Sequence, residues 1–227
     1  HFRVGARGTY PGFQDRYYSG RRPNGIYIPR FRNISEQRPD YIRGFGYQGG
    51  ASRSGWQRTV AELGVGPELK EAVAQPGDWS MGMTGFGEML PYHENKVSLT
   101  GDKLDKFGLP TFIFDCEIKE NELQMRKDMR DSAAEMLEAA GFKDVRTYDD
   151  ASGPGLGIHE MGTARMGRDP KTSVLNKWNQ LHEVPNVFVT DGAAMTSSAC
   201  QNPSLTYMAL TARAADYAVS EMKKNNL

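Results

Sequence analysis

The chain is organised around three short motifs in its last third: IHEMGTARMG at residues 158–167, VFVTDG at 187–192 and NPSLT at 202–206. The first is rich in glycine and contains a histidine. The second is an apolar run that ends in Asp-Gly, and the third places Asn-Pro before a long apolar repeat. Because the three motifs lie close together in the sequence, we expect them to share one site and the preceding residues to surround it.

The third motif predicts the last helix of the chain. Pro203 suits the first helical position, because its fixed φ fits a helix and its missing N–H would be unpaired there. Asn202 is then predicted at the N-cap. The apolar positions that follow have helical spacing: Leu205, Met208, Ala209, Ala212, Ala215, Val219 and Met222. The start of such a helix carries unpaired N–H groups and a partial positive charge, which favour an anion.

The second motif predicts a buried strand that ends in a turn at Asp191-Gly192. A strand, a polar loop and a helix start form the arrangement with which α/β proteins bind ligands. Taken singly, each motif also fits a simpler explanation: a helix cap, a plain turn, or a histidine that is packed or exposed. Their combination and order favour a functional site.

This combination resembles the C-terminal part of the glucose–methanol–choline (GMC) flavin oxidoreductases. HEMGTARMG at 159–167 is similar to the family motif His-x-x-Gly-Thr-x-x-Met-Gly, and VTDG at 189–192 is similar to its flavin-contacting turn. NPSLT resembles the Asn-Pro-x-x-Thr form of the His/Asn branch, which includes pyranose oxidase, cellobiose dehydrogenase and gluconate-dehydrogenase-like members. DKFGLP at 105–110 fits a further family pattern.

The resemblance implies a role for each matched residue. His159 matches the catalytic histidine that takes the hydroxyl proton of an alcohol, a task for which the near-neutral pKa of imidazole is suited. Asn202 matches the second member of the catalytic pair and would hold the substrate oxygen. The resemblance also implies FAD as cofactor, contacted by Asp191, Gly192, Asn202, Pro203 and Thr206.

The implied function is oxidation of a CH–OH group of a sugar, sugar acid or other alcohol, with hydride transfer to flavin N5. The chain lacks a Gly-x-Gly-x-x-Gly turn between a strand and a helix, which this chemistry needs for FAD. We therefore expect a C-terminal portion of a longer protein, inactive alone. The alternative is a non-catalytic carbohydrate-binding or interaction module of the same fold. The sequence leaves open the substrate, the electron acceptor, a covalent flavin link and the oligomeric state.

The predicted fold is α+β: a mainly antiparallel sheet covered by helices, plus the last strand and helix of an incomplete FAD-binding α/β domain. We expect an extended loop at 1–24, a substrate-binding domain at 25–157 and a C-terminal segment at 158–227 with the catalytic pair. Predicted strands lie at 25–31, 41–48, 80–90, 95–100, 111–116 and 145–148. Predicted helices lie at 67–74 and 120–140, the second with an apolar stripe from Leu123 to Ala140.

Composition excludes several other classes of protein. Lys and Arg number 28, as do Asp and Glu, so nothing favours electrostatic capture of nucleic acid. No apolar run reaches the roughly 18 residues of a membrane span, and we expect a soluble protein, cytoplasmic or periplasmic. The four histidines lack the spacing of metal ligands, so no metal site is expected. Cys116 and Cys200 are predicted to be free thiols.

Overall fold

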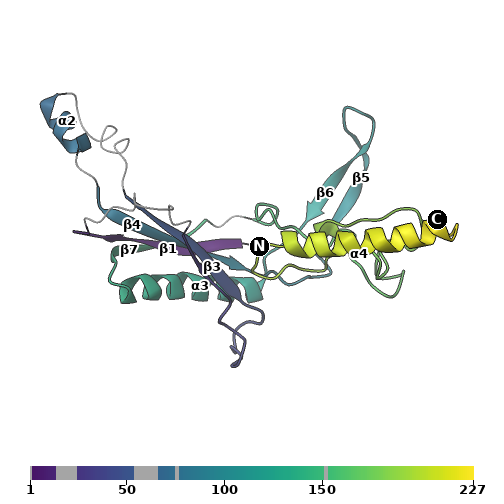
Figure 1. Cartoon of the computed structure of the whole chain (residues 1–227), viewed down its shortest axis with the longest axis horizontal. Coiled ribbons are helices and arrows are strands. Elements are labelled where there is room, and N and C mark those ends of the chain that lie inside the picture. The colour runs from purple at the N-terminus through teal and green to yellow at the C-terminus, as the bar shows by residue number, and fades with distance from the viewer. Residues whose placement is uncertain (1, 14–24, 54–65, 75–76, 151–152) are drawn as a thin grey trace. The chain divides into compact units, whose positions relative to one another are not determined.

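The computed structural model describes residues 2–13, 25–53, 66–74, 77–150 and 153–227 (Figure 1). The chain has the predicted α+β composition. It forms two compact units: a sheet unit of Arg3–Phe86 and Gln124–Ala151, and a motif unit of His1–Phe2, Gly87–Leu123 and Ser152–Leu227. This division differs from the predicted one, because Gly87–Leu123 groups with the segment that contains the three motifs.

The sheet unit is built on five strands in the order β2-β3-β4-β1-β7. The pairs β1/β7 and β2/β3 are antiparallel, with Gly5 opposite Tyr148 and Tyr27 opposite Gln48. Most of these strands lie where the sequence predicts them. Their bounds are Phe2–Tyr10 for β1, Ile26–Ile28 for β2, Phe45–Arg53 for β3, Trp79–Gly87 for β4 and Lys143–Asp149 for β7.

The prediction of a loop at residues 1–24 is wrong for Phe2–Tyr10, which form β1 between β4 and β7. Val4 and Ala6 are fully buried, but the glycines and arginines between the apolar positions hide the strand pattern. Gly5 is required by close packing, since a Cβ there would lie 2.0 Å from the carbonyl oxygen of Met83. Residues 14–24 of the predicted loop lie outside the described residues.

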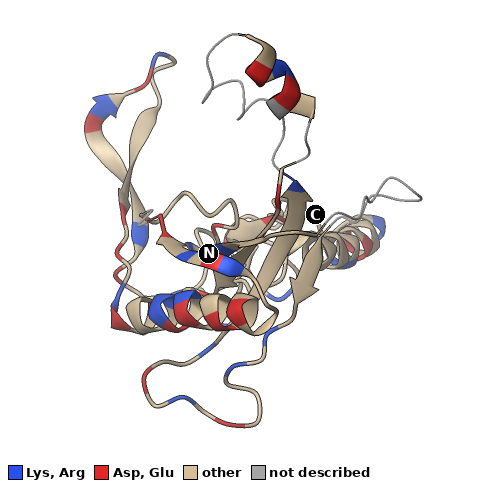
Figure 2. Cartoon of the chain, turned by 90° about the vertical axis from the view of Figure 1, so that its left-hand side faces the viewer, with Lys and Arg blue, Asp and Glu red and all other residues tan. Residues whose placement is uncertain are grey.

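Helix α3 (Glu120–Ala139) provides much of the core of the sheet unit, and α2 (Pro67–Ala74) is short. The buried apolar side chains of α3 are Met125, Met129, Ala133 and Leu137. The Tyr47 hydroxyl donates to the carbonyl of Met129 at 2.6 Å and ties β3 to the helix. Leu123, predicted in the apolar stripe, is instead exposed. Charged residues of both signs are distributed along the surface of α3 (Figure 2).

The motif unit contains the β5–β6 ribbon, a two-stranded antiparallel sheet of Lys96–Leu104 and Pro110–Asp115. It also contains the 3₁₀ turn η1 (Gly192–Ala194) and helix α4 (Ser204–Lys223). The predicted strand at 186–190 is not regular: within the described residues Phe188 forms an isolated antiparallel bridge with Gln180. A strand forms by pairing with a neighbouring strand along its edge. Here the neighbour is the short segment around Gln180, which pairs at one position only.

The start of α4 differs from the prediction by one residue. The helix begins at Ser204, Pro203 occupies the N-cap, and no side chain caps the helix. Asn202 therefore lies outside the helix, one residue before the cap. The missing N–H of Pro203 is harmless at this position too, since the backbone donors of the first turn begin with Ser204.

Candidate functional site

Gly192 is the point at which the first motif and the start of α4 pack against the second motif. A Cβ placed there would lie 2.9 Å from the carbonyl oxygen of Glu160, 2.9 Å from the hydroxyl of Tyr207 and 3.0 Å from the sulfur of Met161. Glu160 and Met161 belong to the first motif, Gly192 to the second, and Tyr207 follows the third on α4. Only glycine fits this close approach of three segments without displacing a neighbour.

Backbone hydrogen bonds run along the first and second motifs and hold them side by side. The N–H groups of Gly162, Ala164 and Met166 donate to the carbonyls of Gly192, Ala193 and Ala194, at 3.2, 2.9 and 2.9 Å. Gly162 adopts φ +92°, a conformation that favours glycine. Gly162 therefore serves the path of the chain beside η1.

His159 lies at the entry to this paired segment and is partly buried. Burial lowers its pKa from the usual 6.5, against the opposing effect of the neighbouring Glu160. The carboxylate of Glu160 accepts from the N–H of Gly157 at 2.9 Å and fixes the turn before the histidine. Ile158 has φ +57°, which is strained for a β-branched residue. Such strain clusters at functional sites.

The other predicted site residues lie in the second motif and at the start of α4. The Asp191 carboxylate accepts from the N–H of Ala193 at 2.9 Å and caps η1. Pro203 is buried, whereas Asn202 and Thr206 are exposed. The side chains of Asn202 and Thr206 have no hydrogen-bond partner among the described residues. The Asn202 amide and the Thr206 hydroxyl are therefore available to a ligand. The convergence of the His159 and Asn202 side chains stays a prediction.

Tyr207 is a residue of this site that the sequence reasoning missed. Its hydroxyl donates to the sulfur of Met161 at 3.4 Å, so it joins α4 to the first motif. Burial raises its pKa, with further contributions from Asp191 and Glu160, and the phenol therefore stays protonated. Its position four residues after the buried Pro203, on the same face of the helix, is the signal that could have identified it.

The segment between the first and second motifs is anchored to the middle of α4. The rings of Trp178 and Tyr217 are stacked, with centroids 4.7 Å apart and planes at 5°. Arg213 donates to the side-chain oxygen of buried Asn179 at 3.1 Å. These contacts lie on the face of α4 around buried Ala214, and they fix the loop whose ends bear the two motifs.

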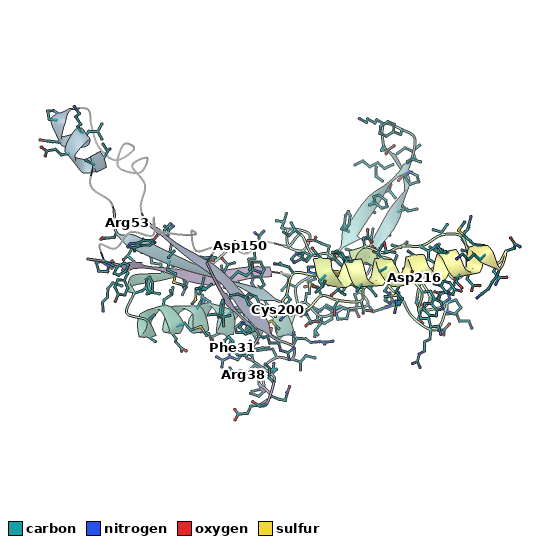
Figure 3. All side chains as sticks on the ribbon, in the orientation of Figure 1. Phe31, Arg38, Arg53, Asp150, Cys200 and Asp216 are labelled. Atoms are coloured by element: carbon teal, nitrogen blue, oxygen red, sulfur yellow. The ribbon has the colours of Figure 1, made fainter. Side chains whose placement is uncertain are left out.

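The loop before α4 is anchored from a different direction. Ser197 donates to the carboxylate of Glu88 at 3.0 Å, and Glu88 is buried. Cys200 is buried in the same loop (labelled in Figure 3), and neither Cys200 nor Cys116 forms a disulfide, as the sequence predicts. The loop that leads to Asn202 is therefore fixed by the hydrogen bond of Ser197 to Glu88 and by the burial of Cys200.

The predicted apolar stripe of α4 is exposed in the described structure, while the opposite face packs. Leu205 is 79% exposed and Met208 is 68% exposed, and Val219 and Met222 are exposed as well. Exposed apolar patches of this kind mark surfaces that bind another part of a protein or a partner.

No group of three or more His, Cys, Asp or Glu side chains in the described ranges could hold a metal ion. None of the helices in that part of the chain combines the length and hydropathy needed to cross a lipid bilayer.

Comparison with known proteins places the chain in a family. The GMC oxidoreductase model matches residues 91–211, more than half of the chain and all three motifs. The 2-methyl-1,2-propanediol dehydrogenase of Mycolicibacterium austroafricanum is 42% identical over 133 residues, which are 58% of this chain and 24% of that protein. The fructose dehydrogenase large subunit of Gluconobacter japonicus is 28% identical over 173 residues, 76% of this chain and 31% of the relative.

A third relative is the gluconate 2-dehydrogenase flavoprotein of Pantoea cypripedii, 30% identical over 154 residues, 64% of this chain and 25% of the relative. The chain thus spans between a quarter and a third of the length of these relatives. The family match confirms the resemblance found in the motifs, and the chain belongs to the GMC oxidoreductases.

Proposed function

We propose that this chain is the C-terminal part of an FAD-dependent oxidoreductase that oxidises a CH–OH group of a sugar, sugar acid or other alcohol. The observation that carries the proposal is the packing of the first motif and the start of α4, which follows the third motif, against Gly192 of the second. Similarity to relatives named as a propanediol dehydrogenase, a fructose dehydrogenase and a gluconate dehydrogenase flavoprotein supports the class of substrate.

The residues around Gly192 fit the edge of a flavin nucleotide. The first turn of α4 offers backbone N–H groups and the positive end of the helix dipole, which suit the negative charge of a reduced flavin. The absence of a Cβ at Gly192 lets Glu160, Met161 and Tyr207 pack closely against the second motif. Asp191, Gly192, Asn202, Pro203 and Thr206 would hold the cofactor, which when bound accepts hydride from the carbinol carbon.

The chain itself supplies the proton chemistry. His159 takes the hydroxyl proton while the carbinol carbon loses hydride, so the alcohol becomes a carbonyl. The lowered pKa of His159 keeps its imidazole neutral, and therefore able to accept a proton, at neutral pH. The amide of Asn202 donates to the substrate oxygen and orients the hydroxyl toward the base.

Two features of the motif unit support a missing FAD-binding part. The apolar stripe of α4 is exposed, and the strand expected at 186–190 has only an isolated bridge. In a complete α/β domain, a neighbouring strand would pair with the segment at 186–190, and a further layer would cover the apolar stripe of α4.

The test is flavin reduction by substrate in the full-length protein. His159→Ala is expected to slow reduction at least 100-fold, while His93→Ala, an exposed histidine outside the three motifs, leaves the rate unchanged. A reduction rate that survives in His159→Ala contradicts the role of the base. A full-length protein that binds no flavin, and whose upstream sequence lacks the glycine-rich turn, favours the alternative of a carbohydrate-binding or interaction module.

A further inference from the structure

His159 lies in a short segment of the motif unit that is held on both sides of the histidine. After it, the N–H of Gly162 donates to the carbonyl of Gly192 at 3.2 Å. Before it, the N–H of Gly157 donates to the carboxylate of Glu160 at 2.9 Å. The side chain of Glu160 thus reaches back over His159 and closes the turn in which the histidine lies.

The turn contains an unfavourable backbone conformation at Ile158. This residue has φ +57°, a region in which the side chain of a β-branched residue is crowded by the backbone. The side chain is 81% exposed, so its packing contributes little to holding the conformation. Such a conformation persists only where surrounding contacts impose it. The hydrogen bond of Glu160 to Gly157 spans Ile158 and is a contact that can impose it.

This hydrogen bond satisfies a donor that the fold has buried. Gly157 is buried, whereas Glu160 is exposed. A buried N–H group needs an acceptor, and the Glu160 carboxylate supplies one while its side chain stays in contact with water. The amide oxygen of a glutamine could accept the same hydrogen bond, whereas a methyl group could not. The contact therefore depends on an acceptor oxygen, which a substitution can keep while it removes the charge.

The backbone of Glu160 is fixed separately from its side chain. The carbonyl oxygen of Glu160 would lie 2.9 Å from a Cβ placed on Gly192, so this backbone packs closely against the second motif. A side chain that leaves a fixed backbone has a defined reach. Glu160 therefore links the turn around His159 to the second motif, whose Asp-Gly turn is predicted to contact the flavin.

We propose that Glu160 is a positioning residue for His159: its carboxylate accepts the Gly157 N–H, holds the turn and thereby aims the imidazole at the substrate hydroxyl. This role of Glu160 rests on the proposed function, in which His159 is the base. A proton is transferred only when the donor and acceptor atoms lie within hydrogen-bond reach, and a misplacement of about 1 Å can slow a reaction about 100-fold. Loss of the turn should therefore slow the chemical step more than it weakens substrate binding.

The first test is independent of any substrate. Hydrogen exchange of the Gly157 N–H is measured in the full-length protein by mass spectrometry with fragmentation to single residues. Glu160→Ala removes the acceptor and is expected to speed this exchange at least about tenfold. Glu160→Gln keeps the acceptor oxygen and is expected to preserve the protection. Glu183→Ala, at an exposed glutamate outside the three motifs, is the matched control and should leave the exchange unchanged.

The second test is stopped-flow reduction of the flavin at a pH of about 8, where a neutral imidazole predominates. The probe is the compound that reduces the flavin fastest among glucose, gluconate and 1,2-propanediol, which are a sugar, a sugar acid and a simple alcohol. Glu160→Ala is expected to lower the limiting rate at least about tenfold while the dissociation constant of the probe changes less than about twofold. Glu160→Gln is expected to recover the rate to within about threefold of the unmodified protein.

Protection of Gly157 that survives in Glu160→Ala, or a Glu160→Gln rate as low as that of Glu160→Ala, overturns the proposal. An unchanged rate in Glu160→Ala beside a slow His159→Ala contradicts the positioning role alone. A fast His159→Ala contradicts the base, and with it the need to position one. If Glu160→Ala does not fold, Ile158→Gly is added to it, because glycine adopts this φ without strain. The same faster exchange and lower rate are then expected, since the acceptor is still missing.

Discussion

The hydroxyl of Tyr207 lies 3.4 Å from the sulfur of Met161, and both atoms border the space above Gly192. The start of α4, the Asp-Gly turn and the histidine motif are therefore packed against one another, and do not merely follow one another in sequence. This packing explains why a glycine is needed at 192, and it predicts which substitution disturbs the site without removing a predicted catalytic group.

Gly192→Ala is expected to destabilise the motif unit and to weaken flavin binding. The added Cβ meets a carbonyl, a hydroxyl and a sulfur at about 3 Å, and such overpacking costs about 1–3 kcal/mol. Urea unfolding of the full-length protein measures the change in stability, and a flavin titration is expected to show at least tenfold weaker binding.

Gly101→Ala is the control for this substitution, because a Cβ at Gly101 has no atom of another residue within 4 Å. Its stability is expected to stay within about 0.5 kcal/mol of the parent protein. If Gly192→Ala behaves like Gly101→Ala, the close approach of the three motifs is wrong.

The sequence predicted most of the elements because their patterns are local. The strands of the sheet unit, α2 and α3 combine regular apolar spacing with Pro or Gly at their ends, as at Pro67 and Gly141. Strand β1 was missed because it contains Gly5 and Gly8, which weaken the strand pattern. A side chain at either position would crowd residues that are distant in the sequence. A periodic pattern of side chains reveals local preference, whereas the position of β1 depends on packing against strands that are distant in the sequence.

The site was predictable in its motifs and less so in its supporting contacts. His159, Asp191, Gly192 and Pro203 stand out through residue type and order. Tyr207 acts through a contact with Met161, 46 positions earlier in the chain, which no local pattern reveals. The strand expected at 186–190 failed for a related reason. Its neighbour is the short segment 179–181, with which it forms one bridge, from Phe188 to Gln180, and the flanking backbone hydrogen bonds.

The rate of flavin reduction is expected to depend on pH through His159. Burial lowers the pKa of this histidine below 6.5, so its neutral, proton-accepting form predominates at neutral pH. The rate should therefore be constant above about 6.5 and fall as the pH drops through the lowered pKa. Stopped-flow reduction between pH 5 and pH 9 measures the inflection.

The free energy of unfolding should also fall as the pH drops through the lowered pKa of His159. A histidine with a lowered pKa in the folded state binds its proton more readily in the unfolded state, so its contribution is present above about pH 6.5 and is lost as the pH falls through the folded pKa. His159→Ala should reduce this pH dependence. An inflection above 6.5, or one that persists in His159→Ala, argues that another group titrates.

Glu122→Gln is expected to destabilise the start of α3. The Glu122 side chain is fully buried and accepts from the N–H of Leu90 at 3.0 Å, the hydroxyl of Tyr92 at 3.0 Å and the N–H of Lys119 at 3.2 Å. In the last contact the Glu122 side chain reaches back to the N–H of the residue before the helix, as the glutamate of a capping box does. Burial and the contact with Glu122 raise the pKa of Tyr92 to about 12, so that hydroxyl stays a donor throughout the range in which the protein is handled.

An amide at position 122 offers one acceptor oxygen in place of two and adds two donors that need partners. The expected loss is about 1–3 kcal/mol in free energy of unfolding, measured by urea denaturation. Glu135→Gln, at an exposed position of the same helix, is the control and should change stability by less than about 0.5 kcal/mol. Equal stability of the two variants would mean that α3 begins without the help of the Glu122 carboxylate, contrary to the hydrogen bonds that converge on it.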